Sequence, residues 1–157
     1  MPEPVHASRF APLPPSRVET WSNFLAWPDR TYFPTLVGLT LQEMRTDYAR
    51  ILLPFRPELE QPAGVIHGGV VATLIDSVAV PAIGGGYDER RAMATISMNV
   101  EYRSAAAGTD LVVEGWVEQR GRSIVFCRAE VRDDGGSVVA VGSTVYKVSS
   151  RTLPGGV

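Results

Sequence analysis

The sequence predicts an α+β domain in which an antiparallel sheet of five to six strands wraps around one central apolar helix. Residues 64–86, GVIHGGVVATLIDSVAVPAIGGG, are almost wholly apolar and predict a buried helix over about 68–82. Residues 95–103, TISMNVEYR, alternate apolar and polar side chains, as a half-buried strand does. Further strand segments follow at regular spacing, and a twisted sheet with that many strands can curl around a helix that has no polar face.

The first element expected along the chain is a short helix. Ser16 can cap a helix that runs through Ala26, stops at Pro28 and serves as a lid or flank to the core. In residues 38–59, GLTLQEMRTDYARILLPFRPEL, two alternating runs separated by RTD predict a pair of strands, or one strand broken by a turn.

The strand at 95–103 has the most regular pattern. Its alternation places Ile96, Met98, Val100 and Tyr102 on one face, with the polar side chains, Thr95 among them, on the other. Three more strands are expected at roughly 109–120, 122–132 and 137–148. The DDGG between the last two is typical of a hairpin turn, because glycine tolerates the positive φ that tight turns need.

Length and composition indicate a single domain with a small-molecule partner. At 157 residues the chain can bury its own core, and we expect one domain over 16–148, with flexible segments at 1–15 and 149–157. The net charge is -2 and the 15 basic residues form no cluster, so neither nucleic acid nor an anionic membrane surface is an expected partner.

A cytoplasmic location is the expected one. The N-terminus shows no charged segment followed by an apolar run, and the single cysteine cannot form an internal disulfide. The apolar stretch at 64–86 is interrupted by His67, Asp76, Pro81 and several glycines, well short of the ~20 apolar residues that a membrane span needs.

Asp76, in ATLIDSVAV, lies in the middle of the apolar helix. Burying a carboxylate costs several kcal/mol unless it is paired, so a functional aspartate is favoured over one that bonds a backbone amide or an arginine. His67 precedes two glycines that leave the first helical amides uncovered, and such amides can form an oxyanion hole. The alternative is that His67 caps the helix and that Gly68 and Gly69 permit tight packing.

The spacing of these residues predicts a site shared between two subunits. Asp76 lies eight residues after Gly68, about 12 Å along a helix, too far to act on a carbonyl held at the start of the same helix. Two such helices packed antiparallel about a two-fold axis would place Asp76 of one subunit beside Gly68 of the other. The second subunit would also cover the open side of the wrapped helix.

Other catalytic motifs are absent from the sequence. It contains no Gly-x-Ser-x-Gly, no cysteine and histidine set adequate for zinc, no phosphate-binding loop and no dinucleotide fingerprint. The chemistry is therefore expected to come from aspartate, backbone amides and water.

The segments at 52–83, 95–108 and 118–142 resemble the hotdog-fold acyl-CoA thioesterases of the phenylacetic-acid-degradation (PaaI) type. The resemblance covers about residues 36–148, and its specific part is HGG followed by an aspartate seven residues after the second glycine. It implies a sheet wrapped around a helix, homodimers paired into homotetramers, and hydrolysis of an acyl-CoA thioester. It implies neither a metal nor a cofactor, with coenzyme A entering only as part of the substrate.

By position, the resemblance gives five residues a catalytic role. Asp76 would be the general base or the nucleophile, and the Gly68 amide would polarise the thioester carbonyl. His67 would help orient the site, and Thr95 would lie near the attacking water. Gln61 stands where such enzymes commonly have asparagine.

The resemblance also implies where coenzyme A binds. It would lie against strand ends that correspond to Arg103 and to the GRS segment Gly121, Arg122 and Ser123, where an arginine can meet a phosphate. The proline usual after the RS at 103–104 is replaced by Ala105.

Two other functions remain open at this point. One is a hydratase or dehydratase of enoyl or hydroxyacyl thioesters on the same fold, which generally needs a histidine base, and the chain has only His6 and His67. The other is a non-catalytic module that binds acyl-CoA, although no DNA-binding motif accompanies the domain as an output.

Overall fold

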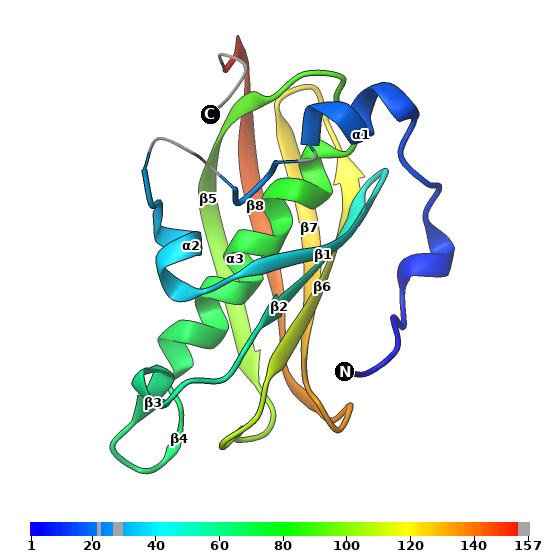
Figure 1. Ribbon diagram of the computed structural model, residues 1–157. Coiled ribbons are helices and arrows are strands. Elements are labelled where there is room, and N and C mark those ends of the chain that lie inside the picture. Colours follow the sequence, from blue (N-terminus) through cyan, green and yellow to red (C-terminus); the bar gives the residue numbers. More distant parts are fainter. Residues whose placement is uncertain (22, 27–29, 154–157) are drawn as a thin grey trace.

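In the computed structural model, which describes residues 1–21, 23–26 and 30–153, one antiparallel sheet curves around a long helix (Figure 1). The six strands are ordered β1-β2-β6-β7-β8-β5. Their bounds, with that of the helix α3, are β1 Thr40–Arg45, β2 Tyr48–Leu53, α3 Gly68–Gly84, β5 Arg91–Tyr102, β6 Leu111–Arg120, β7 Ile124–Asp133 and β8 Val138–Thr152. The predicted α+β class, the wrapped sheet and the central helix are confirmed.

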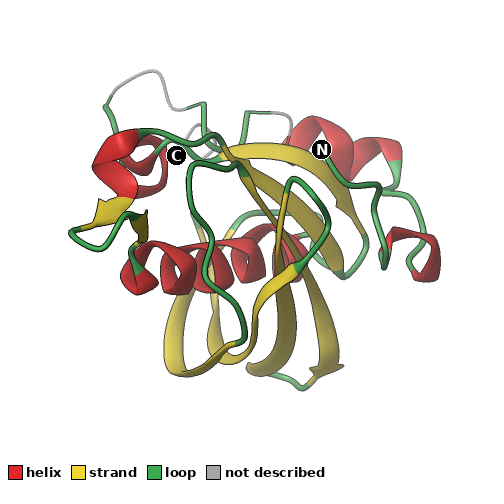
Figure 2. Cartoon of the chain, turned by 90° about the horizontal axis from the view of Figure 1, so that it is seen from below, coloured by secondary structure: helices red, strands yellow, loops and turns green. Residues whose placement is uncertain are grey.

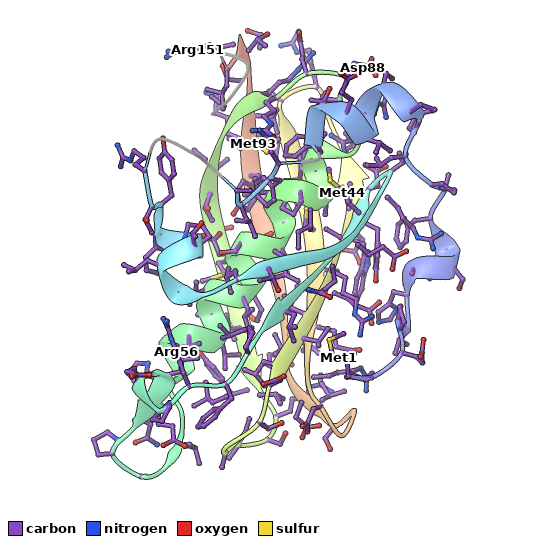
Figure 3. All side chains as sticks on the ribbon, viewed as in Figure 1. Met1, Met44, Arg56, Asp88, Met93 and Arg151 are labelled. Carbon is purple, nitrogen blue, oxygen red and sulfur yellow. The ribbon has the colours of Figure 1, made fainter. Side chains whose placement is uncertain are left out.

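Helix α3 lies in the curve of the sheet and contacts all six of these strands (Figure 2). Two glycines allow the close approach: a Cβ on Gly142 would lie 2.7 Å from Ile75, and one on Gly115 would meet Val78. The side chains between helix and sheet fill the core (Figure 3), and the buried residues of α3 are mostly aliphatic. Within the described residues, no helix is both long enough and apolar enough to cross a membrane.

The β7–β8 hairpin forms at DDGG, as predicted. Gly136 has φ +87°, and its amide donates to the Asp133 carbonyl at 3.0 Å. A shorter hairpin precedes α3: after the 3₁₀ turn η2 (Pro57–Leu59), β3 (Glu60–Gln61) pairs with β4 (Val65–Ile66).

Strand β5 lies at the edge of the sheet and pairs only with β8 among the described strands. Several of its apolar side chains are exposed, with Ile96 57% exposed, Met98 40% and Tyr102 56%. An edge with unpaired backbone groups and exposed apolar side chains is a template for pairing with another strand.

The predicted faces of β5 are wrong at one point. A register shift between Thr95 and Ser97 inserts an extra residue, so Thr95 pairs with Tyr146 and shares the helix-facing side with Met98 and Val100. The strict alternation had placed Thr95 on the opposite face. A bulge of this kind changes which residues face the core without breaking the strand.

The N-terminal helix is shorter than predicted. Helix α1 spans Pro15–Trp21, and a turn follows in which the Phe24 amide donates to the Trp21 carbonyl at 3.1 Å. Leu25 has φ +71°, which cannot continue a right-handed helix, so the expected extension to Ala26 is wrong. Pro28, the expected stop, lies outside the described residues. A second helix, α2 (Phe33–Val37), follows and was not predicted.

The segment before α1 lies along the outer side of the sheet. It contains the 3₁₀ turn η1 (Ala7–Arg9), and the amides of Val5 and His6 donate to the Glu114 carboxylate, each at 2.9 Å. The ring of His6 lies 4.3 Å from that of Trp116. Flexibility of residues 1–15 and 149–157 stays a prediction, although the structure describes these contacts and continues β8 to Thr152.

Candidate active site

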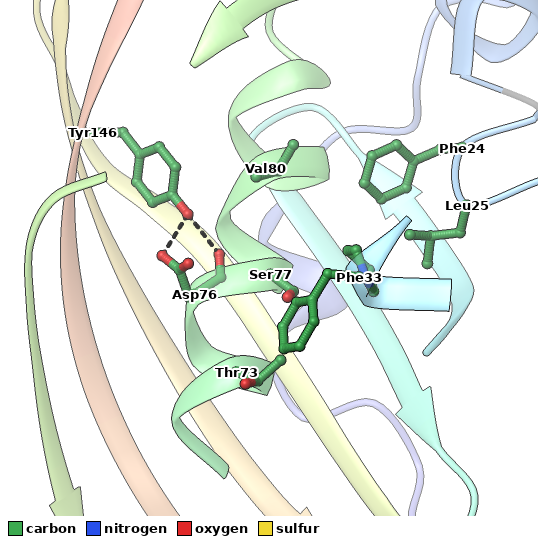
Figure 4. A pocket seen from close by; sticks show the side chains of 9 residues that line it. Phe24, Leu25, Phe33, Thr73, Asp76, Ser77, Val80 and Tyr146 are labelled. Atoms are coloured by element: carbon green, nitrogen blue, oxygen red, sulfur yellow. Dashed lines mark hydrogen bonds between the residues drawn. The ribbon is translucent and has the colours of Figure 1, made fainter. Parts of the chain in front are cut away.

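Asp76 projects from the middle of α3 and is half-buried. Its Oδ1 accepts two hydrogen bonds, from the Thr95 hydroxyl at 2.8 Å and from the Tyr146 hydroxyl at 2.6 Å (Figure 4 shows the second). No donor among the described residues reaches Oδ2. One carboxylate oxygen is thus held by two strands, and the other remains available to a water molecule or a substrate.

Tyr146 was missed by the sequence analysis. Its hydroxyl also lies 2.8 Å from the Asp76 carbonyl oxygen. Burial, and after it the hydrogen bond to Asp76, raise the pKa of Tyr146 above the ordinary value, so the phenol stays protonated and donates. A signal existed: Tyr146 belongs to the helix-facing alternation of β8, and a buried tyrosine hydroxyl requires a polar partner.

Asp76 and Tyr146 line a pocket of about 290 Å³, which we call the acyl pocket. Helix α3 forms one side of this pocket, with hydroxyl, carboxylate and aliphatic side chains. The segment around α2 forms an apolar wall on the opposite side (Figure 4). The residues of that wall are Phe24, Leu25, Phe33 and Pro34, and those of α3 are Thr73, Asp76, Ser77 and Val80. Phe24 and Leu25, at the end of the predicted lid or flank, therefore form part of this wall.

The start of α3 is capped by His67. Its Nδ1 accepts a hydrogen bond from the Gly69 amide at 2.8 Å, so one of the two glycine amides is already satisfied. Nothing in the described part of the chain accepts a hydrogen bond from the Gly68 amide. The Tyr102 hydroxyl donates to the Gly68 carbonyl oxygen at 2.8 Å and fixes the first turn of the helix against β5.

Gln61, Gly68 and Arg103 line a second pocket of about 370 Å³, beside the start of α3. The Gln61 side-chain oxygen accepts from the Ala63 amide at 3.0 Å. Arg103 is exposed, and its guanidinium nitrogen lies 3.3 Å from a carboxylate oxygen of Glu101. These three residues are brought together by the fold, but Asp76 is not among the residues that line this pocket.

The residues predicted to bind coenzyme A lie at opposite ends of the sheet. The turn at 121–123 joins β6 to β7 at the end of the sheet where Thr95 pairs with Tyr146. Arg103 follows Tyr102 at the opposite end of β5 (Figure 1). The site residues therefore form two groups: Asp76 and Thr95 in one, and Gly68 with its neighbours in the other, while the turn at 121–123 lies toward the Thr95 end of the sheet.

Comparison with known proteins places the chain in a family. Residues 63–140 match the family described as Thioesterase superfamily. The protein Rv1847 of Mycobacterium tuberculosis is 34% identical over 116 residues, which cover 70% of this chain and 81% of that protein. The chain belongs to the thioesterase superfamily. Human acyl-coenzyme A thioesterase 13 is 32% identical over 82 residues, 50% of this chain and 57% of that protein.

Solved structures of similar proteins agree with the fold. The Rv1847 structure aligns with a TM-score of 0.72 at 27% identity, over 77% of this chain and 98% of that one. The Escherichia coli PaaI protein, from the phenylacetic acid degradation operon, aligns with a TM-score of 0.75 over 85% of this chain and 96% of that one. Its identity is 16%, so this likeness shows the shared fold alone.

The single cysteine is expected to be unreactive in the native protein. Cys127 is 2% exposed on β7, and burial raises the pKa of its thiol to about 12. At pH 8, Ellman's reagent should therefore titrate no thiol in the folded protein and one thiol per chain in guanidinium chloride. Rapid titration without denaturant would show that this strand opens in solution.

Proposed function

We propose that the protein hydrolyses an acyl-CoA thioester to the free acid and coenzyme A. Asp76 acts as general base or nucleophile, and the Gly68 amide binds the carbonyl oxygen. The observation that carries this is the environment of Asp76: a carboxylate in a thioesterase-superfamily chain that lines an apolar-walled pocket, with one oxygen fixed by Thr95 and Tyr146 and the other bonded by no donor of the described residues. These groups and water suffice without a metal or cofactor.

The reaction exchanges a carbon–sulfur bond for a carbon–oxygen bond and moves one proton from water to sulfur. Asp76 takes a proton from water as the water oxygen bonds to the thioester carbon, and the Gly68 amide donates to the oxyanion that forms. The carbon–sulfur bond then breaks, and the coenzyme A sulfur receives the proton. Alternatively, Asp76 attacks the carbon directly, coenzyme A leaves as the thiolate, and water hydrolyses the resulting anhydride, with one of its protons passing to the sulfur. Either route needs an unengaged carboxylate oxygen.

A second copy of the chain is part of the proposal. Asp76 and Gly68 line separate pockets, and about 12 Å of helix separates them. Pairing two chains through the exposed edges of β5 would extend the sheet and lay the two α3 helices antiparallel. Each Asp76 would then face Gly68 of the partner subunit. The proposed unit is this homodimer, assembled further into a homotetramer.

The same two-fold pairing explains why the residues predicted to bind coenzyme A lie at opposite ends of the sheet. It would bring the turn formed by Gly121, Arg122 and Ser123 of one subunit toward Arg103 of the other. Arg103 and Arg122 are both exposed and could each meet a phosphate of coenzyme A. His67 would act through its cap, which holds the helix start and leaves the Gly68 amide free, while Gln61 lines the approach to that amide.

The test of the proposed function is release of free coenzyme A from a panel of acyl-CoA thioesters that differ in length, branching and aromaticity. We expect at least one substrate to be hydrolysed by the wild type and not by Asp76→Asn. Tight binding with no thiol release by wild type from any substrate would identify a binding module instead. Hydration of crotonyl-CoA without thiol release would identify a hydratase.

A further inference from the structure

Two apolar pockets meet at Phe24. On one side is the acyl pocket, and on the other is a pocket of about 240 Å³, which we call the side pocket. Phe24, Pro34 and Val80 line both of them. The remaining residues of the side pocket are Trp21, Tyr32, Arg90, Arg91 and Leu153.

We propose that Phe24 is the partition that limits the length of the acyl group. The ring closes the acyl pocket on the side away from Asp76, so that the pocket accepts a compact apolar acyl group and a longer chain cannot enter the side pocket. This inference rests on the proposed function, because it assigns the acyl pocket to the acyl part of the substrate.

The volumes support this limit. An engineered apolar cavity of about 150 Å³ holds benzene, so the acyl pocket, at about 290 Å³, has room for a six-membered ring with a short tether or a short chain of similar volume. The side pocket would add about 240 Å³ if the two were joined. A long acyl chain needs that added volume.

Phe24 is held in place from two sides. Its ring lies 5.6 Å from that of Trp21, which is 4% exposed and packs on Gly84 at the end of α3. On the other side, the carbonyl of Leu25 accepts a hydrogen bond from the Thr35 hydroxyl at 3.2 Å, which ties this turn to α2. The partition is therefore anchored both to the end of α3 and to the helix that forms the rest of the wall.

The partition comes from residues that precede the segment matched by the family model. The family match begins at residue 63, whereas Phe24, Phe33 and Pro34 all precede it. Catalysis and acyl-length selection would then reside in different segments, so the wall can be altered while Asp76 and its hydrogen-bond donors stay unchanged.

The test compares two wall variants and one control. Phe24→Ala should join the pockets and raise kcat/KM for dodecanoyl-CoA relative to hexanoyl-CoA by at least about tenfold, because even one methylene in a hydrophobic pocket is worth about 10- to 200-fold. Phe33 lines the acyl pocket only, so Phe33→Ala should lower kcat/KM for hexanoyl-CoA without raising kcat/KM for dodecanoyl-CoA. Leu36 lies on the same helix as Phe33, is 64% exposed and lines neither pocket. Leu36→Ala should therefore keep the kcat/KM values of the wild type.

Affinity provides a readout that does not depend on hydrolysis. The same variants would be titrated with hexyl-CoA and dodecyl-CoA thioethers, which cannot be hydrolysed, and Phe24→Leu would replace Phe24→Ala if the latter melts early. A gain for dodecyl-CoA in a protein that hydrolyses nothing would support the partition and refute the proposed function. An unchanged length preference in a folded Phe24 variant, by rate and by affinity, would overturn the inference while leaving the proposed function intact.

Discussion

Replacing Asp76 with asparagine should lower kcat by about 10²- to 10⁴-fold, the usual contribution of a general base. The amide cannot accept a proton from water or attack a thioester, whichever route the reaction follows. Affinity for acyl-CoA should stay near wild type, because the pocket walls are unchanged. Steady-state release of coenzyme A and titration with a thioether analogue measure the two effects separately.

The fold of Asp76→Asn should be retained. The asparagine Oδ1 can still accept from Thr95 and Tyr146, and the change removes a partly buried charge, so the melting temperature should stay the same or rise. Asp134→Asn is the matched control, since Asp134 is exposed in the β7–β8 hairpin and should tolerate the change without loss of rate. A destabilised but still active Asp76→Asn protein would instead identify a structural aspartate.

Gly68→Pro should lower kcat by about 10²- to 10³-fold, as expected for the loss of one oxyanion-hole donor. Proline removes the amide hydrogen, adds a ring, and is tolerated in the first helical turn. His67 already has the extended backbone, with ψ 135°, that a following proline requires. Circular dichroism and melting temperature would check that the helix still forms.

Gly68→Ala separates the loss of the amide hydrogen from added bulk. Its new Cβ would lie 3.4 Å from the Tyr102 ring, which is the short end of ordinary van der Waals contact, and the amide hydrogen is kept. Alanine should therefore retain most of the activity that proline loses. An equal loss in both variants would assign the effect to crowding at the helix start rather than to the amide.

The sequence predicted the parts of the fold that periodicity and turn chemistry determine. Helix α3 is apolar nearly all round, and DDGG sets the last hairpin, so both were found with small errors at their ends. The bulge at Thr95 was not visible, because one inserted residue leaves the apolar and polar pattern of β5 almost unchanged. The predicted alternation consequently placed Thr95 on the wrong face, although the family resemblance implied a place for it near the attacking water.

The candidate site was predicted where it depends on residue type and missed where it depends on packing. A lone carboxylate in an apolar helix identified Asp76 directly. Tyr146 is 70 residues away in the chain, and its contact with Asp76 arises only when β8 packs on α3. The part of the wall formed by Phe33 and Pro34 was also missed, since α2 has only five residues and too little periodicity to reveal which face it buries.

The central claim is that each active site is built from two subunits, and mixing two inactive variants tests it most directly. An Asp76→Ala protein and a Gly68→Pro protein would be dissociated, combined and reassembled, and coenzyme A release would be compared with that of each variant alone. Every heterodimer carries one site with both an intact Asp76 and an intact Gly68. We predict recovery of roughly a quarter to a half of the wild-type sites. No recovery, in a sample whose heterodimers are confirmed by mass spectrometry, would contradict the shared site.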